Sequence, residues 1–179
     1  MKNIFLTILT IGFIGLRAQT FTLKSNTLGG QATSKEVFNG FGCTGQNISP
    51  ELHWENAPAE TKSFAVTVYD PDAPTGSGWW HWVIFDIPAQ TNSLVANSGT
   101  VNLNLAPTGS IQSLTDFGTT GYGGPCPPEG HGLHQYLITI YALKTDKLGL
   151  DAKTTPAIVG FNLNANVIGK ASLVMYYQR

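Results

Sequence analysis

The sequence predicts a mainly β fold of the sandwich type. Gly, Pro, Asn, Ser and Thr interrupt short apolar runs along most of its 179 residues, which include 20 Gly and 10 Pro. This pattern is typical of short strands joined by turns. Two runs, 63–69 and 135–143, are apolar at both alternating positions, which indicates central strands covered on two sides. Only one segment has a helical period.

Six segments are expected to form strands, because each is a short apolar run bounded by turn residues. They are 21–25, 51–54, 63–70, 82–87, 135–143 and 171–177. The segments 26–50 and 88–134 are long and irregular. Since long loops in a small domain are usually functional, these two are expected to contribute to a site.

One helix is expected over 156–168. Thr155 precedes it as N-cap, and Pro156 takes the first helical position, where its missing N–H is no loss. Gly169 is expected to end the helix. The apolar stripe expected to face the core consists of Ile158, Phe161, Ala165 and Ile168.

Residues 1–18 have the features of a secretory signal peptide, which leaves 19–179 as a single domain. Lys2 precedes the apolar run 4–16, and Ala18 offers a small residue for cleavage. The run is shorter than the ~20 residues of a membrane span. A buried N-terminal strand is the alternative. The sequence therefore predicts an exported protein, periplasmic or secreted, with no membrane span.

The charge balance disfavours nucleic acid as a partner. Of 10 Lys and Arg, two lie before residue 19, which leaves 8 basic against 11 acidic side chains and a net charge of −3. No cluster of basic residues could hold a phosphate backbone or an anionic membrane surface. Any anionic ligand must therefore be recognised locally.

The chain contains two cysteines, Cys43 and Cys126. In an exported protein a single disulfide between them is the simplest expectation. Two free thiols are the alternative, since the sequence does not show whether the two Cα atoms approach within ~7 Å.

Residues capable of chemistry gather in two loops that border expected strands. The first loop, 70–81, is Asp-Pro-Asp-Ala-Pro-Thr-Gly-Ser-Gly-Trp-Trp-His, and the second, 121–136, is Gly-Tyr-Gly-Gly-Pro-Cys-Pro-Pro-Glu-Gly-His-Gly-Leu-His-Gln-Tyr. Loops held by strands commonly carry binding and catalytic groups. Alternation is expected to point His81 away from both of its tryptophan neighbours, leaving Trp79 as the aromatic wall of a site.

These two loops resemble the motifs of the phosphatidylethanolamine-binding protein family, also called Raf kinase inhibitor-like proteins, and in particular its bacterial branch. The similarity extends to 42–50 (Gly-Cys-Thr-Gly-Gln-Asn-Ile-Ser-Pro), Trp54 and 61–64. It implies a large central antiparallel sheet, a smaller sheet and one or two peripheral helices. It also implies a small pocket for phosphate or a phospholipid head group, with no cofactor and no metal.

Carried over by position, the resemblance implies these ligand-binding residues: Asp70, Asp72, Trp79, His81, Pro125, His134 and Tyr136. An imidazolium from His81 or His134, with the Tyr136 hydroxyl, suits a phosphate. Asp70 would orient and charge His81, or the carboxylates would meet an ammonium group on a zwitterionic ligand. Asx-turns beside the prolines are the alternative for both acids. The family also implies a cis bond before Pro74.

Two classes of function remain open. The first is a binding or regulatory protein for a small phosphate-containing or zwitterionic ligand, a class that includes inhibitors of a kinase or protease. The second is a hydrolase that uses the Asp/His pocket for acid–base chemistry, although Ser77 has no evident base and no Gly-x-Ser-x-Gly motif occurs.

His131 lies three residues before His134 and departs from the family pattern. With Asp70 or Asp72 the two histidines could ligate zinc. They lie in a Gly-flanked loop, however, and not on a helix. We therefore expect no metal and leave His131 outside the site.

Overall fold

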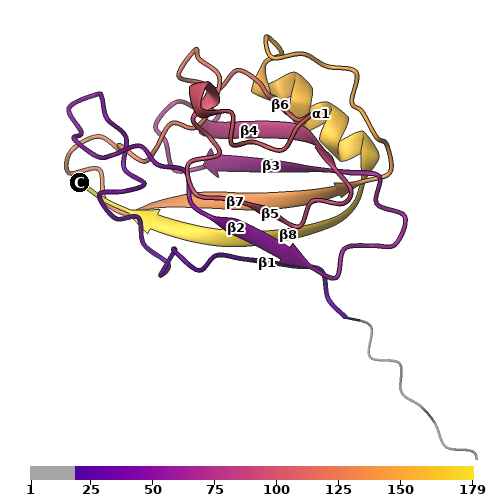
Figure 1. Ribbon diagram of the computed structural model, residues 1–179. Coiled ribbons are helices and arrows are strands. Elements are labelled where there is room, and N and C mark those ends of the chain that lie inside the picture. Colours follow the sequence, from indigo (N-terminus) through magenta and orange to yellow (C-terminus); the bar gives the residue numbers. More distant parts are fainter. Residues whose placement is uncertain (1–18) are drawn as a thin grey trace, which may run out of the picture.

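Two antiparallel sheets form the protein in the computed structural model, which describes residues 19–179 (Figure 1). The strands are β1 (Thr22–Lys24), β2 (Leu52–Glu55), β3 (Ser63–Asp70), β4 (Trp79–Pro88), β5 (Ser93–Leu94), β6 (Ile111–Gln112), β7 (His134–Leu143) and β8 (Val167–Tyr177). A 3-10 turn, η1 (Val101–Leu103), and one helix, α1 (Pro156–Asn166), complete the elements. The predicted signal peptide lies outside the described residues.

The large sheet has the order β6-β4-β3-β7-β8, and the small sheet has the order β1-β2-β5. The mainly β prediction, with a large and a small antiparallel sheet, is confirmed. β3 has the predicted bounds, whereas β4 and β8 begin earlier than predicted. β5 and β6 were not predicted, because a two-residue strand is too short to show a period.

β3 and β7 pair at the centre of the large sheet because both of their faces are apolar. On one face, Val66 and Ile138 join the core that lies between the two sheets. On the other face, Ala65 packs with Val159 and Leu163 of α1. Each central strand therefore contributes to two cores, as its double apolar pattern predicts.

α1 covers the outer face of the large sheet with a different stripe from the one predicted. Val159 and Leu163 are buried, whereas Ile158 is 51% and Phe161 75% exposed. The predicted stripe is thus wrong. The helix carries no charge and has apolar residues on both sides, so its sequence pattern does not distinguish the buried face.

The helix also ends differently from the prediction. It stops at Asn166, and the chain continues directly into β8, so that Gly169 is a strand residue and not a terminator. A Cβ on Gly169 would lie 2.9 Å from Pro58 Cγ, so glycine is needed there for close packing. Thr155 occupies the N-cap position without a side-chain capping bond. Within residues 19–179, no helix has the length and apolar character needed to span a membrane.

Truncating the buried stripe of α1 is expected to destabilise the protein. Leu163→Ala should lower the free energy of unfolding by about 2 to 3 kcal/mol, because it leaves a cavity against the large sheet. Phe161→Ala, which removes an exposed ring, should change it by less than about 0.5 kcal/mol. Urea unfolding of the two variants compares them, and equal losses would contradict the observed orientation of the helix.

Two loops meet at the end of the sheets that also holds the C-terminus, and a disulfide joins them (Figure 1). Cys43 and Cys126 are bonded with their Cα atoms 6.1 Å apart, which confirms the disulfide and excludes the free-thiol alternative. Beside it, a Cβ on Gly124 would lie 1.9 Å from Glu36 O, so the loops approach too closely for a side chain. The long irregular segments are thus held together at one end of the molecule.

Candidate ligand-binding cavity

A cavity of about 210 Å³ opens where β3 ends and β4 and β7 begin. In an antiparallel sheet these three strand ends are neighbours, so the two loops identified in the sequence converge there. The lining residues are Phe41, Asp70, Ala73, Pro74, Thr75, Trp79, His81, Phe117, Cys126, Pro127, Pro128, His134 and Tyr136. Five of the seven predicted site residues are therefore brought together.

The other two predicted residues, Asp72 and Pro125, are not among the residues that line the cavity. Asp72 is exposed, and its Oδ2 accepts the N–H of Gln135 at 2.8 Å, which fixes the start of β7. Pro125 is buried, and its carbonyl accepts the N–H of Phe38 at 3.0 Å. Both residues shape the loops around the cavity.

The loop after β3 turns without a cis peptide bond. Every peptide bond within residues 19–179 is trans, so the cis bond expected before Pro74 is not found. Instead, Asp70 Oδ1 accepts the N–H of Asp72 at 2.8 Å, and Gly76 and Gly78 adopt positive φ. Asp70 therefore makes the Asx-turn considered as its alternative role, and it lines the cavity as well.

His81 reaches the cavity because of an irregularity in β4. Val68 pairs with Trp82 and Tyr69 with Trp80, so His81 is an extra residue without a partner on β3. Such a bulge re-aims a side chain. His81 contacts Tyr136 edge to face, with ring centroids 5.0 Å apart, in the same core that buries Trp82.

The predicted alternation is therefore right for Trp80, whose ring packs against Tyr69 on the other side of the sheet at a tilt of 40°, and wrong for Trp82. A second irregularity lies farther along β4, where Phe64 pairs with Ile87 and Val66 with Ile84. It leaves Phe85 and Asp86 opposite a single residue of β3. The face pattern of β4 thus changes twice along one strand.

The His81 ring is neutral near pH 7. Burial lowers its pKa from 6.5 to about 4, against the opposing effect of a hydrogen bond to the Gly123 carbonyl. Its Nδ1 lies 2.7 Å from Gly123 O and donates to it, which leaves Nε2 of the neutral ring as an acceptor. The prediction of an imidazolium that donates to phosphate is therefore wrong for His81 above about pH 4.

The lowered pKa of His81 predicts acid sensitivity. The unfolded chain takes up a proton at this histidine below pH 6.5 and the folded protein only below about pH 4, so stability falls as the pH falls through that window. The contribution is on the order of 3 kcal/mol. Between pH 7 and pH 4.5, urea midpoints should fall less for His81→Asn than for the wild type. Parallel profiles would contradict this assignment.

Asp70, His134 and His131 form a chain of hydrogen bonds that leads from the interior to the surface. Asp70 Oδ2 accepts from His134 Nδ1 at 2.7 Å, and both side chains are almost fully buried. On the other side of the ring, His134 Nε2 lies 2.8 Å from Nδ1 of the exposed His131. The prediction that Asp70 orients His81 is therefore wrong, because Asp70 pairs with His134 instead. His131, left outside the predicted site, belongs to the same chain of hydrogen bonds.

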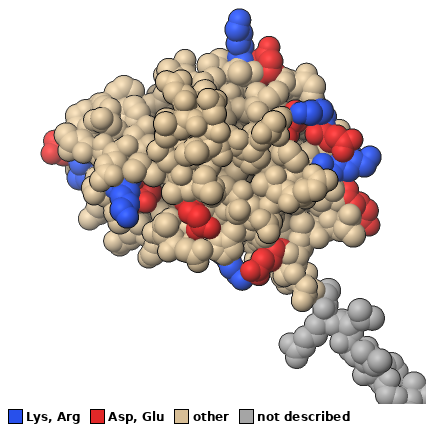
Figure 2. Space-filling model, in the orientation of Figure 1, with Lys and Arg blue, Asp and Glu red and all other residues tan. Residues whose placement is uncertain are grey.

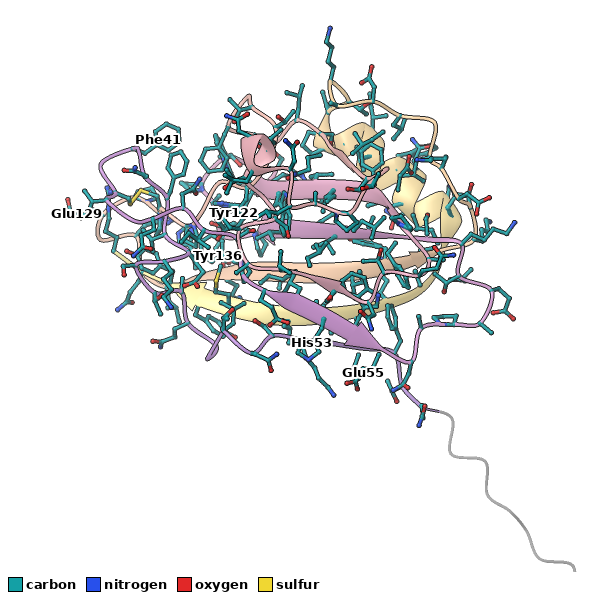
Figure 3. The ribbon with its side chains drawn as sticks, viewed as in Figure 1. Phe41, His53, Glu55, Tyr122, Glu129 and Tyr136 are labelled. Carbon is teal, nitrogen blue, oxygen red and sulfur yellow. A yellow bond between two sulfur atoms is a disulfide. The ribbon has the colours of Figure 1, made fainter. Side chains whose placement is uncertain are left out.

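The Tyr136 hydroxyl is buried and has no hydrogen-bond partner among the described residues. Burial, with the nearby Asp70 carboxylate, raises the pKa of Tyr136, so the phenol keeps its proton. An unpaired buried hydroxyl is costly, and Tyr136 is one of the residues that line the cavity. Figure 3 shows Tyr136 at the same end of the sheets as Phe41.

The family model described as phosphatidylethanolamine-binding protein matches residues 28–178. The chain belongs to the phosphatidylethanolamine-binding protein family. Its relatives include the UPF0098 protein YbcL of Escherichia coli (strain K12), 47% identical over 174 residues, which are 96% of this chain and 95% of YbcL. The UPF0098 protein YbhB of the same organism is 46% identical over 157 residues, covering 87% of this chain and 98% of YbhB.

Solved structures share the fold. The crystal structure of E. coli YbcL, described as a new member of the mammalian PEBP family, matches with a TM-score of 0.87 at 48% identity, covering 90% of this chain and 99% of that one. A putative phosphatidylethanolamine-binding protein homologue, CT736 from Chlamydia trachomatis, matches with a TM-score of 0.73 at 26% identity, covering 89% and 98%. The two-sheet fold is therefore that of the family.

The rim of the cavity in this family member is aromatic, and sequence reasoning missed it. Phe41 is 68% exposed and stacks on Phe117, with centroids 5.7 Å apart, while Trp79 meets Phe117 edge to face at 5.5 Å. Phe41 and Phe117 come from the two irregular segments, where no period marks a side chain. Their only sequence signal is their place in loops long enough to be functional.

Proposed function

We propose that this family member is a binding protein whose cavity takes a small ligand with a phosphate-containing or zwitterionic head group. One observation carries the proposal: hydrogen-bonding groups lie unpaired at the floor of a cavity whose rim is apolar. Tyr136 offers an O–H donor, and His81 offers its Nε2 as an acceptor. Ligand sites commonly combine an apolar lining with a few such polar groups.

The protonation states favour a ligand that both donates and accepts hydrogen bonds. A singly protonated phosphate, or a phosphate ester beside an ammonium group, meets a neutral His81 and the Tyr136 hydroxyl together. The Asp70 carboxylate opposes a second negative charge at the floor. The faces of Phe41 and Trp79 suit either an ammonium cation or an apolar extension of the ligand.

Binding explains the cavity better than hydrolysis does. The hydroxyls that line it belong to Thr75 and Tyr136. Thr75 Oγ1 donates to Gly78 O, and the raised pKa of Tyr136 makes its oxygen a poor nucleophile. The sulfur in the wall, from Cys126, is held in the disulfide. An inhibitor of a kinase or protease would use the same cavity to hold a group of its target.

Export remains part of the proposal. A disulfide that crosses between two loops is typical of oxidising compartments. The periplasm or the cell exterior is therefore the proposed location. There, a secreted protease is a more accessible target than a cytoplasmic kinase.

Removing one hydroxyl tests the proposed site. Tyr136→Phe should weaken binding of phosphoethanolamine about 5- to 10-fold, because the ligand loses one hydrogen bond. Since that hydroxyl has no partner in the described structure, the stability of the variant should not fall. Isothermal titration and tryptophan fluorescence measure the affinity, with inorganic phosphate and ethanolamine as separate ligands.

Tyr69→Phe is the matched control, because it removes a hydroxyl that donates to Ser77 O and does not line the cavity. Its affinity should equal that of the wild type. If none of the three ligands binds at millimolar concentration, or if the two variants bind alike, the proposed function is wrong.

A further inference from the structure

Both ring nitrogens of His134 are already engaged by the protein. Nδ1 pairs with Asp70 in the interior, at a place where neither side chain is more than 3% exposed. Nε2 is paired with His131 Nδ1 at 2.8 Å, and the two rings meet edge to face with centroids 5.1 Å apart. A ligand cannot reach the buried Nδ1, so His134 can bind a ligand only through Nε2.

His131 lies in an exposed segment, residues 128–133. Its neighbours Gly130 and Gly132 both adopt positive φ, and a Cβ on either would meet no atom within 4 Å. These glycines are thus explained by backbone conformation and not by close packing. The backbone N–H of His131 donates to Pro128 O at 3.1 Å, which fixes the turn and leaves the imidazole attached through the contact with His134.

We propose that His131 is an internal competitor of the cavity ligand, which must replace it at His134 Nε2. The inference rests on the proposed function and deepens it. In the free protein the His134 proton lies on Nδ1, toward Asp70, so His134 Nε2 accepts the hydrogen bond that His131 Nδ1–H donates. When a singly protonated phosphate arrives, its O–H donates to His134 Nε2 in place of His131 Nδ1–H, and the His131 ring moves into solvent with its own proton.

The exchange makes His131 a residue that sets affinity without belonging to the cavity wall. It is not among the lining residues, whereas His134 and Asp70 are. Each ligand must replace one ring-to-ring hydrogen bond, so its apparent affinity is reduced by the strength of that bond. Ligands that make no contact with His134 do not incur this cost. The device therefore lowers the affinity of ligands that engage His134 and leaves binding by the aromatic rim alone unaffected.

The test compares two substitutions at one position. His131→Ala removes the competitor and should tighten binding of both inorganic phosphate and phosphoethanolamine about 3- to 10-fold, the range that one net hydrogen bond supplies. His131→Asn, whose amide can take the place of Nδ1, should keep the affinity near that of the wild type. Leu133→Ala changes an exposed side chain of the same loop and serves as the control.

Nitrogen NMR of the imidazoles gives a second readout that does not depend on affinity. In the free protein the His134 Nε2 resonance should move in His131→Ala and stay in Leu133→Ala. On saturation of the wild type with phosphate, the His131 ring signals should shift to those of a solvated histidine. A His134 signal that ignores His131→Ala would overturn the inference even if the ligand binds.

The outcomes separate this inference from the proposed function. Wild-type binding together with equal or weaker binding by His131→Ala overturns the role of His131 and leaves the binding function intact. Wild-type binding together with tighter binding by His131→Ala supports both. If phosphate and phosphoethanolamine bind to neither protein, the proposed function is overturned and the competitor role is overturned with it.

Discussion

Replacing Cys43 and Cys126 together by alanine is expected to lower the free energy of unfolding by about 4 to 5 kcal/mol. The disulfide joins residues 83 positions apart, and in the chain-entropy model such a long loop restricts the unfolded chain strongly. Cys126 also lines the cavity, so the loops around it should loosen. Urea unfolding measures the stability, and titration with phosphoethanolamine should show weaker binding.

Treatment with a reducing agent provides a matched control for this prediction. Dithiothreitol should lower the unfolding midpoint of the wild type toward that of the double variant and leave the double variant unchanged. Thr44→Ala, at an exposed position beside Cys43, should behave like the wild type in both conditions. A loss below about 1 kcal/mol in the double variant would show that the disulfide is not a main source of stability.

Replacing Asp70 by alanine is expected to cost about 3 to 5 kcal/mol of stability and to abolish measurable ligand binding. The substitution leaves His134 Nδ1 without its acceptor in the interior and frees the Asp72 N–H. His134 then has no fixed orientation toward the cavity. Asp70→Asn keeps an oxygen that can accept these bonds and should lose less stability.

Asp72→Ala is the control for Asp70→Ala, because it removes an exposed carboxylate two residues away. It accepts the Gln135 N–H, and its loss should cost about 1 kcal/mol or less. Thermal or urea unfolding ranks the variants, and phosphoethanolamine titration compares their binding. Equal losses from the two alanine variants would contradict the assignment of Asp70 to the buried chain of hydrogen bonds.

The central sheet and the polar floor of the cavity could be predicted because their signals are local or strongly patterned. β3 is apolar on both faces for most of its length, and the strand bounds follow from that pattern alone. Asp70 and Tyr136 lie at the ends of strands that pair side by side, so the topology brings them together. The other residues predicted for the cavity came from the resemblance of the same two loops to the phosphatidylethanolamine-binding protein family.

The remaining features depend on contacts that a single sequence does not encode. The buried face of α1 was chosen wrongly because the helix is apolar on two sides and the covering sheet decides between them. The rim residues Phe41 and Phe117 are close only after two irregular segments meet. His131 is explained by its neighbour His134 across a turn, and no spacing rule for loops predicts that contact.

The two bulges of β4 also bear on how the chain finds its native pairing. In a regular antiparallel ladder a slip of two residues keeps every side chain on its own face, so such slips are weakly opposed. In β4 the face pattern changes at His81 and again at Asp86, so a slip would place at least one of these polar side chains against a core it does not fit. The irregularities that place His81 in the cavity wall therefore also protect the folding chain from settling in a shifted alignment.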